Sequence, residues 1–188
     1  MAHRVCPWWL GYWLLFPLRR FWHDPSALLS PFVREGMTVL EPGPGMGFFT
    51  LELANRVGGS GKVLCVDVQP RMLEVLRRRL AAAGLSARVE ARLAPPESMG
   101  LADAKGRVDF CLAFAVAHEF PDTAKLFREL CEALRPGGRV LLAEPVLHVP
   151  EEDFDAQLAA AAAAGLAVVG RPAIRLSHAV VLEKKVPA

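Results

Sequence analysis

The sequence has little of several residue types whose chemistry would define a function directly. It has four cysteines, at positions 6, 65, 111 and 131, and they form no C-x-x-C pair. Buried reduced thiols are therefore favoured over disulfides, and with them a reducing cytoplasmic location. Tyr12 is the single tyrosine, which excludes a catalytic Tyr-x-x-x-Lys dehydrogenase pair. No apolar run is long enough to span a bilayer.

An excess of charge is also lacking. The 22 basic and 20 acidic residues give a formal net charge of +2, which does not by itself indicate a nucleic-acid partner, because such a partner needs a clustered basic face. The hydrophobic content is 53% and the mean hydropathy is +0.27. At 188 residues the chain suits one domain large enough to bury a proper core.

What the chain does have, first, is an aromatic-rich N-terminal segment over residues 1–36. We expect a cap or flap over the site of the main domain, with Trp9, Tyr12 and Trp13 contacting a substrate. Two alternatives remain open. The segment packs on the flank of a sheet, or residues 8–22 rest on a membrane interface, where Trp and Arg are favoured.

From residue 37 onward, apolar strand-like runs alternate with segments of helical period. Strands are expected at 37–41, 62–67, 87–92, 108–114 and 139–143, and helices at 46–57, from Pro70 to Gly84, after Asp122, and from Glu151 to Gly165. A short helix is expected after Asp24, which would supply its N-cap, as Asp122 would for the helix that follows it. This alternation predicts a doubly wound α/β sheet with right-handed crossovers. Two last strands, at 166–169 and 179–182, have no helix between them and predict a hairpin-like antiparallel end.

A glycine turn follows the first strand in the segment Glu41-Pro42-Gly43-Pro44-Gly45-Met46-Gly47. Glycines allow a sharp turn and close approach of a ligand to the backbone, and the helix that follows offers free N–H groups to an anionic ligand group. Asp67 ends the second strand, and a carboxylate there can accept hydrogen bonds from the vicinal hydroxyls of a ribose. A nucleoside-containing ligand at the carboxyl ends of the strands is therefore expected.

The spacing of the glycines argues against a dinucleotide. The G-x-G-x-x-G pattern requires glycine at position 48, where this chain has Phe48, so the third glycine arrives one residue early. Glu41 also places negative charge where a pyrophosphate would approach, whereas an amino group or a sulfonium suits that charge. S-adenosylmethionine (SAM) is therefore favoured over NAD.

Together these stretches resemble the motifs of the class I SAM-dependent methyltransferases. The segment 41–47 resembles their motif I (E/D-x-G-x-G-x-G), the segment 66–73 their second motif, 108–122 their fourth, and 134–140 the end of the helix after strand four. The resemblance covers roughly residues 37–185. It implies a Rossmann-like, doubly wound, mostly parallel seven-stranded sheet with an antiparallel C-terminal strand, and a SAM-binding methyltransferase domain over residues 37–188.

The resemblance also implies the positions that would bind SAM. Glu41 would bond the ammonium group, Asp67 the ribose, and Phe114 with Ala115 would face the transferring methyl. The full set is Glu41, Gly43, Pro44, Gly45, Gly47, Asp67, Val68, Gln69, Met72, Ala94, Phe114 and Ala115. The stretch 92–95 lacks the acidic residue that many members place after strand three, so the backbone, Glu97 or Ser98 would contact the adenine.

His118 is the candidate catalytic base, because it follows the fourth strand on the ligand side and histidine titrates near neutrality. The alternative is that His118 only packs the loop before Pro121. No Asn/Asp-Pro-Pro-aromatic segment, Pro-Cys nucleophile or metal constellation follows that strand. A small-molecule acceptor that His118 would also contact, and no metal, are expected; Cys6 as a ligand for a soft acceptor is a minor option.

Two other functions stay open at this stage. One is an RNA-modifying methyltransferase that uses Arg19, Arg20, Arg71 and the run 77–79 as an electrostatic track. The other is a non-catalytic SAM-binding or membrane-peripheral protein in which residues 8–22 make the contact.

Overall fold

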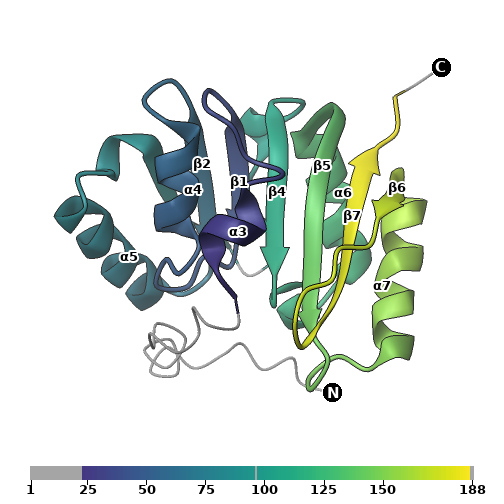
Figure 1. Cartoon of the computed structure of the whole chain (residues 1–188). Coiled ribbons are helices and arrows are strands. Elements are labelled where there is room, and N and C mark those ends of the chain that lie inside the picture. Colours follow the sequence, from purple (N-terminus) through teal and green to yellow (C-terminus); the bar gives the residue numbers. More distant parts are fainter. Residues whose placement is uncertain (1–22, 96, 187–188) are drawn as a thin grey trace. The chain divides into compact units, whose positions relative to one another are not determined.

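The computed structural model describes residues 23–95 and 97–186, which form two compact units with these same bounds. Its seven strands follow the order β3-β2-β1-β4-β5-β7-β6. Within the second unit, β4, β5, β7 and β6 lie side by side in that order (Figure 1). The strands are parallel within the pairs β1–β2, β2–β3 and β4–β5, whereas β7 is antiparallel to β5. The predicted Rossmann-like, doubly wound and mostly parallel α/β fold is confirmed.

The first unit contains three parallel strands and the helices between them. Its elements are α3 (Pro25–Leu29), β1 (Thr38–Pro42), α4 (Thr50–Val57), β2 (Lys62–Asp67), α5 (Pro70–Ala82), the 3-10 turn η2 (Ser86–Arg88) and β3 (Val89–Leu93). Asp24 caps α3 by accepting the Ser26 N–H at 2.9 Å, as predicted. The expected bounds of β2 and the start of α5 at Pro70 are confirmed.

Helix α4 begins at Thr50, four residues later than the predicted start at Met46. The reason lies in the backbone of the preceding turn. Gly45 and Gly47 have φ values of 55° and 86°, in the left-handed region that a right-handed helix cannot contain. The glycine turn therefore extends through residue 49 as a loop.

The second unit contains the remaining strands. Its elements are η3 (Ala102–Ala104), β4 (Val108–Phe114), η4 (Ala117–Glu119), α6 (Thr123–Ala133), β5 (Leu134–Pro145), α7 (Glu151–Ala163), β6 (Leu166–Gly170) and β7 (Ser177–Lys184). Asp122 caps α6 through the Lys125 N–H at 2.8 Å. The pair β6–β7 is antiparallel, which confirms the predicted hairpin-like end.

Strand β5 begins at Leu134 rather than at the predicted Arg139. Leu134 pairs with Val108, and the register with β4 then shifts before Arg139 pairs with Phe110. The residues Pro136-Gly137-Gly138, interpreted as the stop of the preceding helix, lie inside this irregular strand. A Cβ on Gly138 would approach the Val108 carbonyl oxygen to 3.0 Å, so only glycine fits beside β4.

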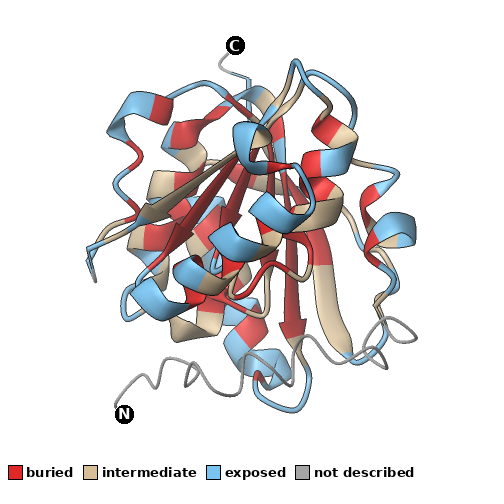
Figure 2. Cartoon of the chain, turned by 90° about the vertical axis from the view of Figure 1, so that its left-hand side faces the viewer, coloured by how far each residue is buried: buried red, intermediate tan, exposed pale blue. Residues whose placement is uncertain are grey.

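The strands carry more of the buried side chains than the helices do, and the helices alternate buried and exposed residues (Figure 2). Within residues 23–95 and 97–186 no helix is both long enough and apolar enough to cross a membrane.

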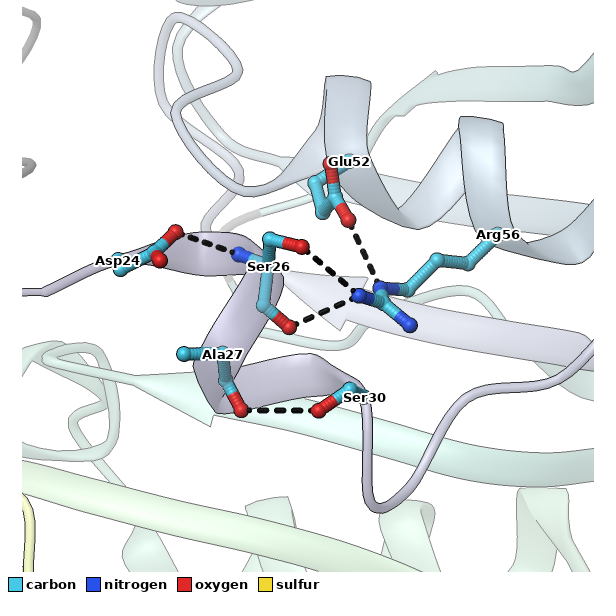
Figure 3. Close-up of polar contacts among 6 residues, drawn as sticks. All are labelled: Asp24, Ser26, Ala27, Ser30, Glu52 and Arg56. Carbon is cyan, nitrogen blue, oxygen red and sulfur yellow. Dashed lines mark hydrogen bonds and ion pairs between the residues drawn. The ribbon is translucent and has the colours of Figure 1, made fainter.

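The part of the predicted cap segment that the structure describes, from residue 23 on, belongs to the first unit and packs on its helix α4. The Arg56 guanidinium on α4 donates from Nη2 to the Ser26 carbonyl at 2.8 Å and to the Ser26 hydroxyl at 3.0 Å, and from Nε to Glu52 at 2.8 Å (Figure 3). Leu29 and Val33 are buried. Cys6 and the predicted substrate contacts Trp9, Tyr12 and Trp13 lie outside the described residues.

Candidate active site

The glycine turn is tied to the ends of its neighbouring strands by backbone hydrogen bonds. Gly43 donates its N–H to the Val66 carbonyl at 2.8 Å, and Gly47 donates to the Pro44 carbonyl at 2.9 Å. A Cβ on Gly45 would meet no atom of the described residues within 4 Å, whereas one on Gly47 would lie 2.5 Å from Leu76. Gly47 therefore serves packing on α5, and Gly45 borders open space that a ligand can enter.

Asp67 links the end of β2 to this turn. Its Oδ2 accepts the Gly45 N–H at 3.3 Å and its Oδ1 accepts the Gln69 N–H at 2.8 Å. Burial raises the pKa of this carboxyl, and the hydrogen bonds from Gln69, Gly45 and Val68 lower it by less. Each carboxylate oxygen retains a further lone pair, so the side chain can still accept hydrogen bonds from a ligand.

The other predicted cofactor positions of the first unit gather near Asp67. Val68 is 40% exposed, Met72 is buried, and Ala94 donates its N–H to the Asp67 carbonyl at 2.9 Å. The ends of β2 and β3 therefore meet at one place, with an exposed apolar side chain beside a carboxylate. This arrangement suits a ribose and an apolar ring edge, and these contacts stay predictions.

Glu41 lies deeper than the other predicted residues. It is 3% exposed, and its Oε2 accepts the Thr50 hydroxyl at 2.6 Å and the Cys65 thiol at 3.5 Å. Burial raises the pKa of Glu41 to about 7, although the hydrogen bonds from Thr50 and Cys65 oppose the rise. The carboxyl thus joins β1, β2 and the first residue of α4 beneath the glycine turn, and its predicted contact with an ammonium group stays a prediction.

The arginine run of α5 also supports the turn. Arg79 donates to the Met46 carbonyl within the turn, and Arg77 donates to the Ala91 carbonyl at 2.7 Å. Arg78 pairs with Glu74 one helical turn away. Arg77 and Arg78 are exposed, and Arg77 and Arg79 also hold neighbouring backbone carbonyls.

In the second unit, the candidate residues follow β4. Phe114 is half-buried, and Ala115 has a φ of 54°, rare for a residue other than glycine. The Ala115 N–H donates to the Ala143 carbonyl at 2.7 Å, which holds this strained residue against β5. Backbone strain of this kind concentrates at functional sites.

His118 lies in the short turn η4 that follows, with its side chain 28% exposed. Its Nδ1 contacts Oε2 of Glu144, which is fully buried on β5. Burial of the ring lowers the pKa of His118, but the hydrogen bond to Glu144 and the charges of Glu144 and Glu119 raise that pKa by more. The ring of His148 stacks on His118 at 6.2 Å between centroids. A titratable ring is thus held in place directly after β4.

Sequence reasoning missed Glu144, Thr50 and Cys65. A usable signal existed for Glu144, since it stands in the apolar run Val140-Leu141-Leu142-Ala143-Glu144-Pro145 and carboxylates are almost never buried unless paired. The pattern gave no such signal for Thr50 and Cys65, because small polar residues and thiols occur in many buried positions.

Two features together identify the class of protein. One is the strand order, and the other is a glycine turn that is hydrogen-bonded to the carboxylate at the end of the next parallel strand. Together they define the class of SAM-dependent methyltransferases. Residues 33–172 match the model of the methyltransferase domain family. The chain belongs to the class I SAM-dependent methyltransferases, enzymes that use SAM as the methyl donor.

Individual relatives agree with this assignment. A ubiquinone/menaquinone biosynthesis C-methyltransferase from Klebsiella pneumoniae is 30% identical over 145 residues, 75% of this chain and 56% of that protein. One from Idiomarina loihiensis is 33% identical over 129 residues, 69% of this chain and 50% of that protein. The chain thus spans about half the length of the curated relatives it matches. A solved SAM-dependent methyltransferase from Aquifex aeolicus is 26% identical, with a TM-score of 0.84 over 96% of this chain and 100% of that chain.

The residues present fit SAM. The open space beside Gly45, the acceptor oxygens of Asp67 and the exposed Val68 provide a close backbone approach, hydrogen-bond acceptors for hydroxyls and an apolar surface. All three lie in the first unit, at the carboxyl ends of β1 and β2.

Proposed function

We propose that this enzyme methylates a small-molecule acceptor at an atom that gives up a proton during the transfer, and that His118 accepts that proton. The observation that carries the proposal is the position of His118, a partly exposed imidazole held directly after β4. The names of the two relatives, both C-methyltransferases of ubiquinone/menaquinone biosynthesis, support a carbon acceptor on a ring compound.

The residues of the chain would divide the work between binding and proton removal. SAM supplies a methyl group already activated on a sulfonium, so most of the acceleration comes from positioning the acceptor and excluding water. We assign the binding of SAM to Glu41, Gly43, Pro44, Gly45, Gly47, Asp67, Val68, Gln69, Met72, Ala94, Phe114 and Ala115. His118 takes the proton, which a carbon or hydroxyl acceptor must lose and a thioether or tertiary amine does not have.

A hydroxylated aromatic ring is the first acceptor class to test. Ionisation of a ring hydroxyl makes the neighbouring carbon nucleophilic, and the ring proton leaves after the methyl group has joined that carbon. We further propose that residues 1–36 form a cap whose Trp9, Tyr12 and Trp13 contact this ring, and that residues 37–188 form the catalytic domain. Cys65 and Cys111, both buried thiols, support a cytoplasmic location.

The test combines SAM binding with an acceptor screen. By calorimetry, Asp67→Ala should weaken SAM binding by about 10- to 100-fold, because two charged hydrogen bonds to the ribose are lost. Glu90→Ala, which removes an exposed carboxylate from β3, should leave the affinity unchanged. Equal SAM affinity in wild type and Asp67→Ala would contradict the binding site.

For the acceptor, naphthohydroquinones, phenols, thiols and tertiary amines are incubated with the enzyme and SAM, and release of S-adenosylhomocysteine is measured. Turnover with the hydroxylated rings that is lost in His118→Ala supports the proposal. Turnover only with tertiary amines, or full activity of His118→Ala across the pH range, would contradict it.

A further inference from the structure

Glu144 bonds to three consecutive residues after β4 and is buried completely. Its Oε1 accepts the N–H groups of Val116 at 3.2 Å and Ala117 at 2.8 Å, and its Oε2 contacts Nδ1 of His118. It stands on β5, which pairs with β4, the strand that these residues follow. One carboxylate thus holds the turn and the ring of the candidate base together.

A fully buried carboxylate is costly unless its charge is compensated. Two backbone N–H groups and an imidazole provide that compensation here. A neutral acceptor would suffice to anchor two N–H groups, so the turn alone does not require a charge at this position. The difference lies at the ring, because an ionised carboxylate accepts hydrogen bonds and donates none, whereas a neutral group could also donate.

An ionised Glu144 sets the direction of its hydrogen bond with His118. Nδ1 of the imidazole must carry a proton to donate to the carboxylate, so in the neutral ring Nε2 is the unprotonated, basic nitrogen. An amide in place of the carboxylate would use its oxygen on the two N–H groups and turn its NH2 toward Nδ1. Nδ1 would then have to accept, and the proton would move to Nε2.

We propose that Glu144 is a positioning residue that holds His118 with its proton on Nδ1, so that Nε2 removes the proton from the acceptor, and that the acceptor is accordingly an O–H or C–H acid. This inference rests on the proposed function. It adds a residue that acts through another residue, and it excludes acceptors whose nucleophilic atom has no proton to lose.

The electron pair of the acceptor atom forms the new bond to the methyl carbon, and the pair of the broken sulfur–carbon bond returns to sulfur, which becomes the neutral thioether of S-adenosylhomocysteine. The acceptor proton goes to Nε2 of His118. The imidazolium that results lies against the Glu144 carboxylate, which balances its charge.

Several charged groups face this pair. His118 meets Glu144 and Glu119, and its ring stacks on that of His148. His178 on β7 lies opposite Glu144 in the strand register and stacks on Phe154 at 5.2 Å. Loss of the Glu144 charge leaves Glu119 and two histidines, so the pKa of His118 should fall and the acidic limb of the activity profile should move to lower pH.

Two measurements test the inference, and the first needs no acceptor. Nitrogen-15 NMR of the full chain should find neutral His118 protonated on Nδ1 in the wild type and on Nε2 in Glu144→Gln. Glu183→Gln, which removes a partly exposed carboxylate of β7, is the control and should keep the wild-type tautomer. A wild-type ring protonated on Nε2 would overturn the inference, and this outcome is decided on the wild type even where the variant fails to fold.

The second measurement uses an acceptor found in the screen above. Glu144→Gln should lower kcat by about 100- to 10,000-fold, as general-base and tautomer losses do, with unchanged SAM affinity and an acidic limb at lower pH. Glu144→Asp, which keeps the charge, should recover part of kcat. A matching kcat and pH profile in wild type and Glu144→Gln would overturn the inference. Failure of the wild type on every O–H and C–H acid would instead contradict the proposed function, while the tautomer result stands separately.

Discussion

At the scale of single residues, the buried carboxyl of Glu41 makes stability depend on pH. Burial raises the pKa of Glu41 from its ordinary value of 4.5 to about 7. The folded-state pKa lies above the unfolded one, so the folded protein keeps a proton that the unfolded chain has lost. The free energy of unfolding therefore falls as the pH rises through this interval, and it stays lower above it.

Glu41→Gln changes the free energy of unfolding, and we expect this change to be more stabilising at about pH 8 than at about pH 4. The difference between the two pH values should be at most about 3 kcal/mol in the SAM-free protein. Urea unfolding of both proteins at the two pH values measures this difference. Glu90 provides a control in which the dependence of stability on pH has the opposite sign. Lys62 and Arg92 lower the pKa of Glu90, so its ionised form stabilises the fold. An effect of Glu41→Gln that is equal at both pH values would be inconsistent with this account.

At the scale of elements, Gly45 and Gly47 of the glycine turn are needed for two different reasons. Gly47→Ala should destabilise the protein by about 1 to 3 kcal/mol, because a Cβ at φ +86° would press on the buried Leu76. Gly45→Ala adds a Cβ in open space at φ +55°, and backbone strain of about 1 kcal/mol is expected. Its larger effect should be on SAM affinity.

Denaturation midpoints and SAM calorimetry of this pair provide the test. Gly45→Ala should lose more affinity than Gly47→Ala once both are compared under conditions in which they are folded. The reverse order would mean that SAM does not approach the backbone at Gly45.

Helix α3 depends on contacts from a neighbouring helix, because five residues are too few for a stable isolated helix. Arg56→Ala removes two hydrogen bonds that join α3 to α4, together with the bond to Glu52 that orients the guanidinium within α4 (Figure 3). We expect faster hydrogen exchange at the Leu28 and Ser30 amides and a loss of about 1 kcal/mol of stability. Arg78→Ala, which breaks an exposed pair with Glu74, should change neither quantity measurably. Unchanged exchange in Arg56→Ala would show that apolar packing alone holds α3.

At the scale of the whole molecule, the charge distribution bears on the RNA-modifying alternative. The formal net charge is only +2, and Arg77 and Arg79 donate to carbonyl groups of their own unit. We therefore expect weak RNA binding. Its affinity should fall with rising salt concentration no more steeply than about two phosphate contacts would cause. Fluorescence anisotropy of the full chain with a structured RNA measures the salt dependence; a steep slope would revive the alternative.

Most of the fold was predictable from the sequence because apolar residues repeat with different periods in strands and in helices. The bounds of β2 and β4 and the N-caps Asp24 and Asp122 agree with the structure. The predicted starts of α4 and β5 were wrong, because glycine occurs in loops and strands as well as at the ends of helices. Gly45 and Gly47 delay α4, and Pro136-Gly137-Gly138 lie inside β5 rather than before it.

The binding half of the site was easier to predict than the catalytic half. The glycine turn and Asp67 are near in sequence and follow a known motif, and the structure joins them by a hydrogen bond. Glu144 lies 26 residues from His118, and only the pairing of β4 with β5 brings them together. A contact made through strand pairing carries no local pattern.

The irregular end of the sheet has a consequence for solubility. β6 is the last strand in the order, and its Val168 and Val169 are 43% and 50% exposed, a composition that invites pairing with another chain. The register with β7 shifts between Val168 and Gly170, so the strand is short and bent where a continuing ladder would have to form. A bulge is one of the devices that discourage an edge strand from pairing with another chain, and it needs no charged side chain at the edge.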